Sequence, residues 1–260
     1  MTDNILKIAT WNVNSLNVRL PHVLQWLESE QPDILVLQET KTVDEKFPAQ
    51  AIDEAGYHVI YAGQKTYNGV AILSRQPAAE IVTDFPGFDD PQRRVLAATI
   101  GNIRILNVYI PNGSSVGAEK YQYKLQWLTA MQAYIEQQLT EYDQFVILGD
   151  FNIAPDDRDV HDPSAWQGQI LVSEAERQAF QAMLTAGLSD TFRLFEQEEK
   201  HFSWWDYRAG AFHRNHGMRI DHILTSKILA ESCQAVTIDR QPRKWQRPSD
   251  HAPVMASFRL

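Results

Sequence analysis

The sequence predicts a four-layer α/β sandwich, in which two stacked mixed β-sheets are flanked by helices within a single domain over residues 1–260. Short apolar runs outnumber the segments with helical periodicity, and the helices interrupt them irregularly. Several of these runs are apolar throughout, so the strands should be buried on both faces. The alternative is a doubly wound parallel sheet, but hairpin signals count against it.

In the first half of the chain, predicted strands alternate with helices. Strands are predicted at the apolar runs 5–12, 33–39, 57–63 and 68–75. A helix is predicted over 18–30, because apolar residues recur on one face from Leu20 to Leu27. A second helix is predicted over 47–55, and Gly56 favours its end there.

In the second half, the segment 93–111 predicts a β-hairpin that turns at Gly101 and Asn102. Helices are predicted over 119–139 and 174–186, where apolar residues recur at helical spacing. Further strands are predicted at 144–152, 219–226, 233–240 and 252–260. Strands therefore outnumber helices here as well, as two packed sheets require.

Six of the predicted strands have polar side chains at or beside one end. They are carboxylates, amides, an imidazole and a phenol: Asn12, Glu39, Tyr109 with Asn112, Asp150 with Asn152, Asp221, and Asp250 with His251. A single residue of this kind is more simply explained as a turn cap. Six such ends favour a shared site instead, because strand ends gather at one rim of a sandwich.

The residue types at these ends narrow the chemistry. The four carboxylates are hard oxygen ligands that suit Mg²⁺ or Mn²⁺, and there is no set of cysteines for zinc. The asparagines can hydrogen-bond phosphate oxygens without changing the charge, and a carboxylate beside His251 would hold its imidazole protonated. The combination favours metal-assisted hydrolysis of a phosphate ester. A glycosidase would need paired carboxylates, but neither a metal nor so many amides.

The composition and the amino terminus limit the class and location that we expect for the protein. The chain is 44% hydrophobic and 22% charged, which is typical of a globular protein. Its single cysteine, Cys233, allows no internal disulfide and fits a reducing compartment. The amino terminus lacks signal-peptide features, and no apolar run reaches the ~20 residues that span a bilayer. We therefore expect a cytoplasmic monomer with no membrane partner.

The charge is unevenly distributed along the chain. The net charge is −9, but between residues 201 and 260 there are nine basic residues and five acidic ones. That segment therefore carries +4, while the first 200 residues carry −13. Such asymmetry permits a local basic face on an acidic protein and is a weak sign of nucleic-acid binding.

The order of the polar motifs resembles that of a known family. WNVN, LQET, NVYIPNG, GDFNIAP, RIDHIL and SDHAP follow one another as in the exonuclease III family of apurinic/apyrimidinic endonucleases, within the endonuclease–exonuclease–phosphatase superfamily. GQKTYNGVAIL, DDPQRRV, FSWWDYR and GMRIDHIL are more specific and match the bacterial branch. The similarity covers essentially the whole chain and implies a DNase I-like sandwich.

The resemblance implies an enzyme and a set of site residues. The activity would be that of a DNA-repair phosphodiesterase that hydrolyses DNA at abasic sites, trims blocked 3′ ends, or both, by Mg²⁺-assisted attack of water. Mn²⁺ would be a substitute. The metal would lie near Glu39, the principal ligand, and near Asn12, Asp250, Asp150 and Asn152. The catalytic residues would be Asp150, which handles the attacking water, with Asn152, Tyr109, and His251 backed by Asp221.

The resemblance also implies how substrate binds. The partner would be double-stranded DNA with abasic sites, nicks or 3′ ends. The residues that contact it would be Asn112 at the phosphate, Trp204, Met218 and Ile220 around a base-free sugar, and Arg93 and Arg94 along the backbone. The segment 156–172 would lie over the DNA. A metal contact of Asn14, the number of metal ions and the balance between the activities stay open.

Two other functions compete with DNA repair. One is a phosphatase for a lipid or inositol phosphate, which FSWWDYR and the paired Arg93 and Arg94 disfavour. The other is a non-catalytic DNA-binding protein, which is disfavoured because every catalytic position is filled.

Overall fold

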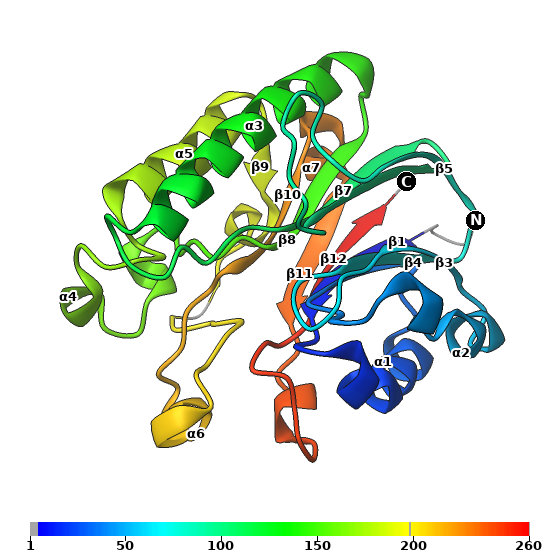
Figure 1. Cartoon of the computed structure of the whole chain (residues 1–260), viewed down its shortest axis with the longest axis horizontal. Helices are drawn as coiled ribbons and strands as arrows, with labels where there is room; N and C mark the ends of the chain where they lie inside the picture. Colours follow the sequence, from blue (N-terminus) through cyan, green and yellow to red (C-terminus); the bar gives the residue numbers. More distant parts are fainter. Residues whose placement is uncertain (1–4, 198, 260) are drawn as a thin grey trace.

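The computed structural model describes residues 5–197 and 199–259. Two six-stranded sheets pack face to face, and helices cover the outer face of each sheet (Figure 1). The predicted four-layer sandwich of two mixed sheets is confirmed. Within the described residues, no helix is both long enough and apolar enough to cross a membrane.

The first sheet has the order β11-β12-β1-β2-β4-β3. Its strands are β1 (Ile5–Asn12), β2 (Ile34–Gln38), β3 (His58–Ala62), β4 (Val70–Ser74), β11 (Cys233–Ile238) and β12 (Val254–Arg259). Only β1 and β2 are paired in parallel, and all other neighbours are antiparallel. The amino-terminal and carboxy-terminal strands therefore lie side by side in one sheet.

The second sheet has the order β5-β6-β7-β8-β10-β9. Its strands are β5 (Ala78–Val82), β6 (Val95–Ile100), β7 (Ile103–Tyr109), β8 (Phe145–Asp150), β9 (Ser189–Asp190) and β10 (Asp221–Thr225). Here β7 and β8 form the parallel pair, and β6 and β7 form the predicted hairpin around Gly101. Each sheet thus has one parallel pair near its middle.

Helices connect many of the strands. They are α1 (Leu16–Glu30), α2 (Ala49–Glu54), α3 (Glu119–Glu141), α4 (Pro163–Trp166), α5 (Glu174–Thr185), α6 (Ala211–Arg214) and α7 (Lys227–Ser232). Short 3₁₀ turns occur at Asp44–Lys46, Asp157–Asp159, Thr191–Leu194, Arg208–Gly210 and Pro242–Lys244. α1 and α2 pack on the first sheet, and α3 and α5 pack on the second (Figure 1).

Alternation along the strands explains why their sequences are apolar on both faces. In β2, Ile34 and Val36 face the core between the sheets, while Leu35 and Leu37 face α1 and α2. Since side chains on a strand alternate between its two faces, a strand between two layers needs apolar residues at every position. Burying each side chain of this size contributes roughly 1.5–3 kcal/mol.

Five helices and strands of the described residues were not predicted, among them α4 and α6, which have only four residues each. β5 is largely exposed at the edge of its sheet, so no apolar run marks it. β9 has two residues and α7 has six, which is too short for a periodic pattern. In addition, α1 begins at Leu16, two residues before the predicted start, and Pro21 lies inside the helix.

Candidate active site

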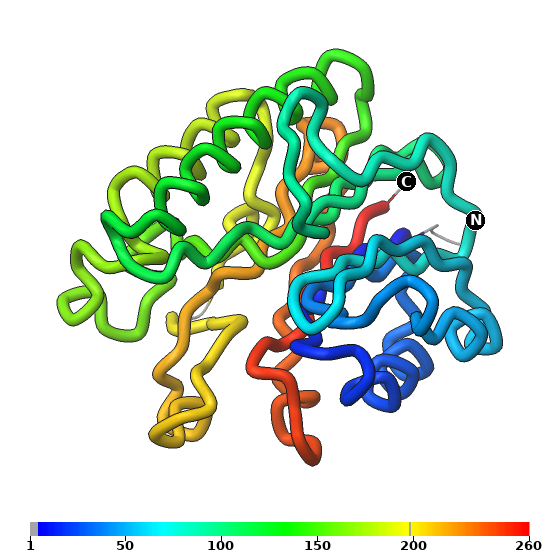
Figure 2. Tube along the Cα trace, in the orientation of Figure 1, coloured from blue at the N-terminus to red at the C-terminus, as the bar shows by residue number. Residues whose placement is uncertain are grey.

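The parallel strand pairs bring the predicted polar residues to one edge of the sandwich. Asn12 at the end of β1 is paired with Gln38, the residue before Glu39. In the second sheet, Tyr109 at the end of β7 is paired with Asp150 at the end of β8. Asp221, at the start of the antiparallel strand β10, is also paired with Asp150. Two loops extend from the body on one side, one containing α6 and the other joining β11 to β12 (Figures 1 and 2).

A glycine permits the close packing beneath Asp150. A Cβ atom at Gly149 would lie 1.9 Å from the carbonyl oxygen of Val108 on the neighbouring strand. The φ of Gly149 is also +146°, a conformation that other residues rarely adopt. The glycine of GDFN is therefore required for β8 to deliver Asp150 beside β7.

Backbone strain occurs at the same place, as it does at several other positions in the described residues. Four non-glycine residues there have left-handed φ values, namely Asn14 (44°), Glu39 (53°), Lys41 (53°) and Asn152 (48°). Such conformations cost free energy and often occur where function needs a particular side-chain direction. Both strained residues contact the site, since Glu39 accepts from Asn12 and the backbone nitrogen of Asn152 donates to Asp150.

An asparagine joins the two central carboxylates. The side-chain nitrogen of Asn12 donates to Glu39 Oε1 at 2.9 Å and to Asp150 Oδ2 at 2.8 Å. The other oxygen of Asp150 accepts a hydrogen bond from the backbone nitrogen of Asn152 at 2.9 Å. The Asp150 carboxylate is therefore held at both oxygens.

A second carboxylate orients the histidine. His251 Nδ1 lies 2.9 Å from Asp221 Oδ2, and its Nε2 lies 3.8 Å from Asp150 Oδ2. Ser203 donates to Asp221 at 2.6 Å and so fixes the carboxylate behind the imidazole. His251, Asp221 and Asp150 are all buried. The imidazole thus lies between two carboxylates, and Asp221 is on the side of His251 that the resemblance implied.

These contacts shift the pKa values of both partners. Burial opposes protonation of His251, but Asp221 and Asp150 outweigh it and raise the pKa of the imidazole to about 10. Burial raises the pKa of Asp150 to about 7, and the positive charge of His251 opposes that rise. At neutral pH, His251 is therefore a cation, and Asp150 lies near its midpoint in the absence of a metal.

Tyr109 and Asn112 lie on the β7 side of the site. The guanidinium of Arg94 lies 4.6 Å from the centre of the Tyr109 ring. Burial, with Glu39 and Asp150 nearby, raises the pKa of the Tyr109 phenol well above its ordinary value, so the phenol stays protonated. Asn112 donates to Asn152 Oδ1 at 3.1 Å. Both residues are therefore neutral hydrogen-bonding groups at the edge of the site.

The group that fits a divalent metal contains Glu39, Asp150 and His251. Ligand atoms of these three residues lie within 4.8 Å of one another. The two carboxylates are donors of the kind that Mg²⁺ prefers, whereas a protonated His251 is not a ligand. Lys41 supplies a positive charge to the same carboxylate, with its Nζ 2.7 Å from Glu39. A divalent cation would satisfy the same negative charge.

Asp250 and Asn14 lie beside this group and contact each other. Asn14 donates to Asp250 Oδ1 at 2.9 Å, and Lys41 donates to Asn14 Oδ1 at 2.6 Å. The other oxygen of Asp250 accepts from the indole nitrogen of Trp204 at 3.1 Å. Asp250 therefore connects the metal side of the site to the predicted sugar pocket.

The predicted pocket wall forms one apolar cluster. Met218 and Ile220 are almost completely buried, and Trp204 is partly exposed. The backbone of Trp204 pairs with Met218 on one side and with His251 on the other. Gly217 permits this approach, because a Cβ there would lie 2.6 Å from the Trp204 carbonyl oxygen. Of these three residues, Trp204 presents the most surface to a substrate.

The two predicted backbone-binding arginines have different surroundings. Arg93 is partly exposed and pairs with Asp84 at 3.3 Å. Arg94 is buried and donates to Gln92 and to the carbonyl oxygen of Tyr109. Arg94 also lines a cavity of about 520 Å³ next to Glu39, Tyr109 and Asn112. Arg93 thus faces outward, while Arg94 supports Tyr109 from inside that cavity.

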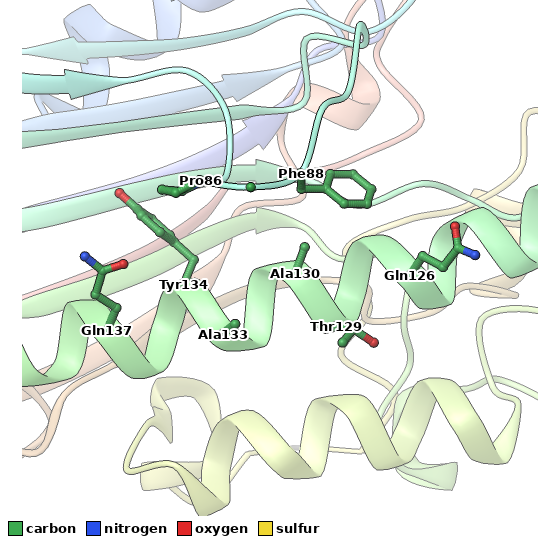
Figure 3. Close-up of a pocket in the computed structure, with 9 residues that line it drawn as sticks. Pro86, Phe88, Gln126, Thr129, Ala130, Ala133, Tyr134 and Gln137 are labelled. Carbon is green, nitrogen blue, oxygen red and sulfur yellow. The ribbon is translucent and has the colours of Figure 1, made fainter.

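Other cavities lie away from this chemistry. A groove of about 510 Å³ between α3 and the segment around Phe88 is lined by Ala130, Ala133 and Tyr134 among others (Figure 3). None of the predicted site residues lines it.

Sequence reasoning missed Lys41 and Ser203. Lys41 follows LQET directly, and Ser203 lies inside the quoted FSWW motif, so position next to a motif was the available signal. Neither residue ends an apolar strand, and this is why the pattern of strand ends did not include them.

A model of the Endonuclease/Exonuclease/phosphatase family matches residues 9–251. The chain belongs to this family. The match extends from β1 to His251 and includes every predicted site residue. The predicted membership is therefore confirmed.

Members of the family with full-length similarity have nuclease names. An exodeoxyribonuclease III from Haemophilus influenzae is 38% identical, and the alignment covers 98% of this chain and 100% of the relative. The DNA repair nuclease APEX1 from Danio rerio is 30% identical, with 96% of this chain and 81% of the relative covered.

Solved structures of the family superpose closely on this fold. A 3′ phosphatase from Neisseria bound to a product DNA hairpin has a TM-score of 0.97 and 48% identity, with 98% of this chain and 100% of that chain covered. An apurinic/apyrimidinic endonuclease from Archaeoglobus fulgidus has a TM-score of 0.95 and 38% identity, with the same coverage. The predicted DNase I-like fold of such endonucleases is thus confirmed.

Proposed function

We propose that the protein is a DNA-repair phosphodiesterase that hydrolyses phosphate esters of DNA with a bound divalent metal. The observation that carries this proposal is the position of Asp150. It accepts a hydrogen bond from Asn12 and lies beside His251, whose imidazole has Asp221 on its other side. Full-length relatives named as exodeoxyribonuclease III and as a DNA repair nuclease support DNA as the substrate. The reaction is attack of water on a phosphodiester or 3′-terminal phosphate.

The residues divide into a metal side and a phosphate side. Mg²⁺, with Mn²⁺ as a substitute, would be held by Glu39, with Asn12, Asn152, Asp150 and Asp250 close by. The metal would supply positive charge to the phosphate and its leaving oxygen. Hard oxygen donors around Glu39 support this assignment.

On the phosphate side, Asp150 accepts the proton of the attacking water, and its raised pKa brings it near the pH at which a general base works best. His251, held as a cation by Asp221, donates to a non-bridging phosphate oxygen as charge builds there. Tyr109 and Asn112 are neutral donors on the β7 side of the same oxygens. Asn152 orients Asp150 through its backbone nitrogen.

The proposed substrate pocket would accept a sugar without a base. A flipped abasic nucleotide has no base to unstack or unpair, so its extrusion costs less than that of an intact nucleotide. Trp204 would cover this sugar, with Met218 and Ile220 behind it. Arg93 would contact the DNA backbone, and Arg94 would support Tyr109 beside the phosphate.

End trimming is the second activity that we propose, and it rests on a similar protein. A relative with 48% identity and a TM-score of 0.97 is a 3′ phosphatase bound to a product DNA hairpin. Removal of a 3′ phosphate and cleavage at an abasic site are both attacks of water on a phosphorus atom, and a metal held at Glu39 would assist both by supplying positive charge. We propose that one site performs both reactions, on a monomer in the cytoplasm.

The test is a comparison of substrates at equal enzyme concentration in Mg²⁺. A duplex with one abasic site, a nicked duplex with a 3′ phosphate and a recessed 3′ end are compared with an inositol phosphate. We expect turnover of at least one DNA substrate, none of the inositol phosphate, and loss of activity when the metal is chelated. Turnover of the inositol phosphate alone, or no turnover of any substrate, would refute the proposal.

A further inference from the structure

A buried ion pair lies directly beneath the site. The side chains of Lys124 in α3 and Glu176 in α5 are both 0% exposed, and their charged ends are in contact. Two buried charges are costly to remove from water, and such a pair is weak support for stability by itself. The position of this pair within the fold therefore calls for a reason other than packing.

The buried position of Glu176 is explained by its contacts at the start of α5. It is the third residue of α5 and forms a capping box with Ser173. It also accepts a hydrogen bond from the backbone nitrogen of Leu171 at 3.1 Å. These donors satisfy both carboxylate oxygens. A neutral glutamine would keep one acceptor oxygen for part of these donors and would lose the rest.

Lys124 has contacts that α5 does not explain. Its ammonium donates to the carbonyl oxygen of Asn152 at 2.7 Å and to the carbonyl oxygen of Asn112 at 3.3 Å. An ammonium has three donors, and Glu176 takes the third. Every donor of Lys124 is therefore used, and two of the three hold loops of the candidate site.

Those two loops carry the asparagines on the phosphate side. Asn152 has a strained φ of 48° and touches Asp150, Asn112 and Ile110 through its backbone or side chain. A left-handed asparagine persists only where its surroundings hold it. Lys124 binds the carbonyl oxygen of this residue, while the Asn152 side chain contacts Asn112 and Ile110.

We propose that Lys124 is a positioning residue for hydrolysis. By binding the carbonyl oxygens of Asn152 and Asn112, it fixes the two loops that place Asp150 and the phosphate relative to each other. This proposal rests on the proposed function. Lys124 does not touch the reacting atoms, and its effect acts through the two asparagines. Small displacements of such groups are costly, because a misplacement of about 1 Å can lower a rate by about 10²-fold.

Glu176 provides a matched control for Lys124. Glu176→Gln removes the ion pair but leaves both carbonyl contacts of Lys124 in place. Lys124→Met removes the ion pair and both carbonyl contacts. The double variant Lys124→Met/Glu176→Gln removes the contacts but leaves no uncompensated charge, and neutral replacements of buried pairs are often well tolerated.

Stability and activity should change independently in these variants, because the ion pair affects stability and the carbonyl contacts affect activity. We expect Glu176→Gln to lower the melting temperature while kcat stays within about threefold of wild type. We expect the double variant to recover the melting temperature while kcat falls by about 10- to 10²-fold and KM for DNA changes little. Equal kcat in wild type and the double variant would overturn the proposal and leave the pair as a packing feature.

Two further measurements keep the proposal testable. If the double variant does not fold, Lys124→Met and Glu176→Gln are compared at a temperature where both are folded; equal kcat in the two would overturn the proposal. The side-chain amide signals of Asn112 and Asn152 in ¹H–¹⁵N spectra test the positioning without any turnover. They should shift in variants without Lys124 and stay near wild type in Glu176→Gln, even if wild type itself proves inactive on DNA.

Discussion

One nitrogen of Asn12 donates to both Glu39, at 2.9 Å, and Asp150, at 2.8 Å. These three residues come from two different sheets, so this amide fastens the sandwich at the edge where the site lies. The Asn12 amide therefore holds the proposed metal ligand, Glu39, close to the proposed base, Asp150. The predictions below concern what these two carboxylates and their neighbours do.

The substitution Asp150→Asn distinguishes two roles of Asp150, namely a turn cap and a general base. If Asp150 were only a cap, asparagine would replace it with little effect. If it accepts the proton of water, cleavage of an abasic duplex should fall by at least about 10²-fold while DNA binding persists. The melting temperature should stay the same or rise, because the ionised carboxylate is buried near Glu39 and Asp221. Turnover equal to wild type at saturating DNA and Mg²⁺ would return Asp150 to the capping role.

Glu39→Gln tests the proposed metal ligand. Glutamine keeps an oxygen that can accept from Asn12 but loses the charge that attracts a cation, so activity in Mg²⁺ should fall by at least about 10²-fold. Calorimetric titration of the DNA-free protein with Mn²⁺ should show weaker binding than in wild type. Added Mn²⁺ should rescue part of the activity. Wild-type rates in Mg²⁺ would remove Glu39 from the metal role.

Binding to duplex DNA should weaken steeply with salt despite the net charge of −9. Of the basic residues after residue 200, Arg219 and Arg243 are buried and cannot release counterions, whereas Lys244 and Arg247 are exposed. Lys244→Gln should reduce the slope of log affinity against log salt by about 0.9.

The control for that prediction is Lys227→Gln. Lys227 is exposed and follows the far end of β10, opposite the end that carries Asp221. Its removal should leave the slope unchanged. A flat salt response of wild type, or equal slopes for the two variants, would show that the 240–248 loop does not contact DNA.

His251 should make the stability of the metal-free protein depend on pH. Its pKa is raised from 6.5 to about 10 in the folded chain, so the fold retains a proton that the unfolded chain releases. This contribution to stability is complete below pH 6.5, decreases between pH 6.5 and 10, and is absent above pH 10. Thermal melts across that window should show a decline that His251→Gln reduces. The same pH dependence in both proteins would show that His251 is not held as a cation.

The sequence by itself determined the layers, because β2 and β8 each begin with four consecutive apolar residues and only a strand between two layers needs that. It also indicated that the polar strand ends belong together, since strand ends share a rim. The tertiary structure decided which groups meet. Arg93 and Arg94 are neighbours in the chain, yet one faces Asp84 and the other lies under Tyr109, because adjacent side chains of an extended segment point to opposite sides. Lys124 lies outside every quoted motif and every predicted strand end. Its role depends on two carbonyl groups 12 and 28 residues away, and only the packing of α3 against both loops brings them into contact with its ammonium.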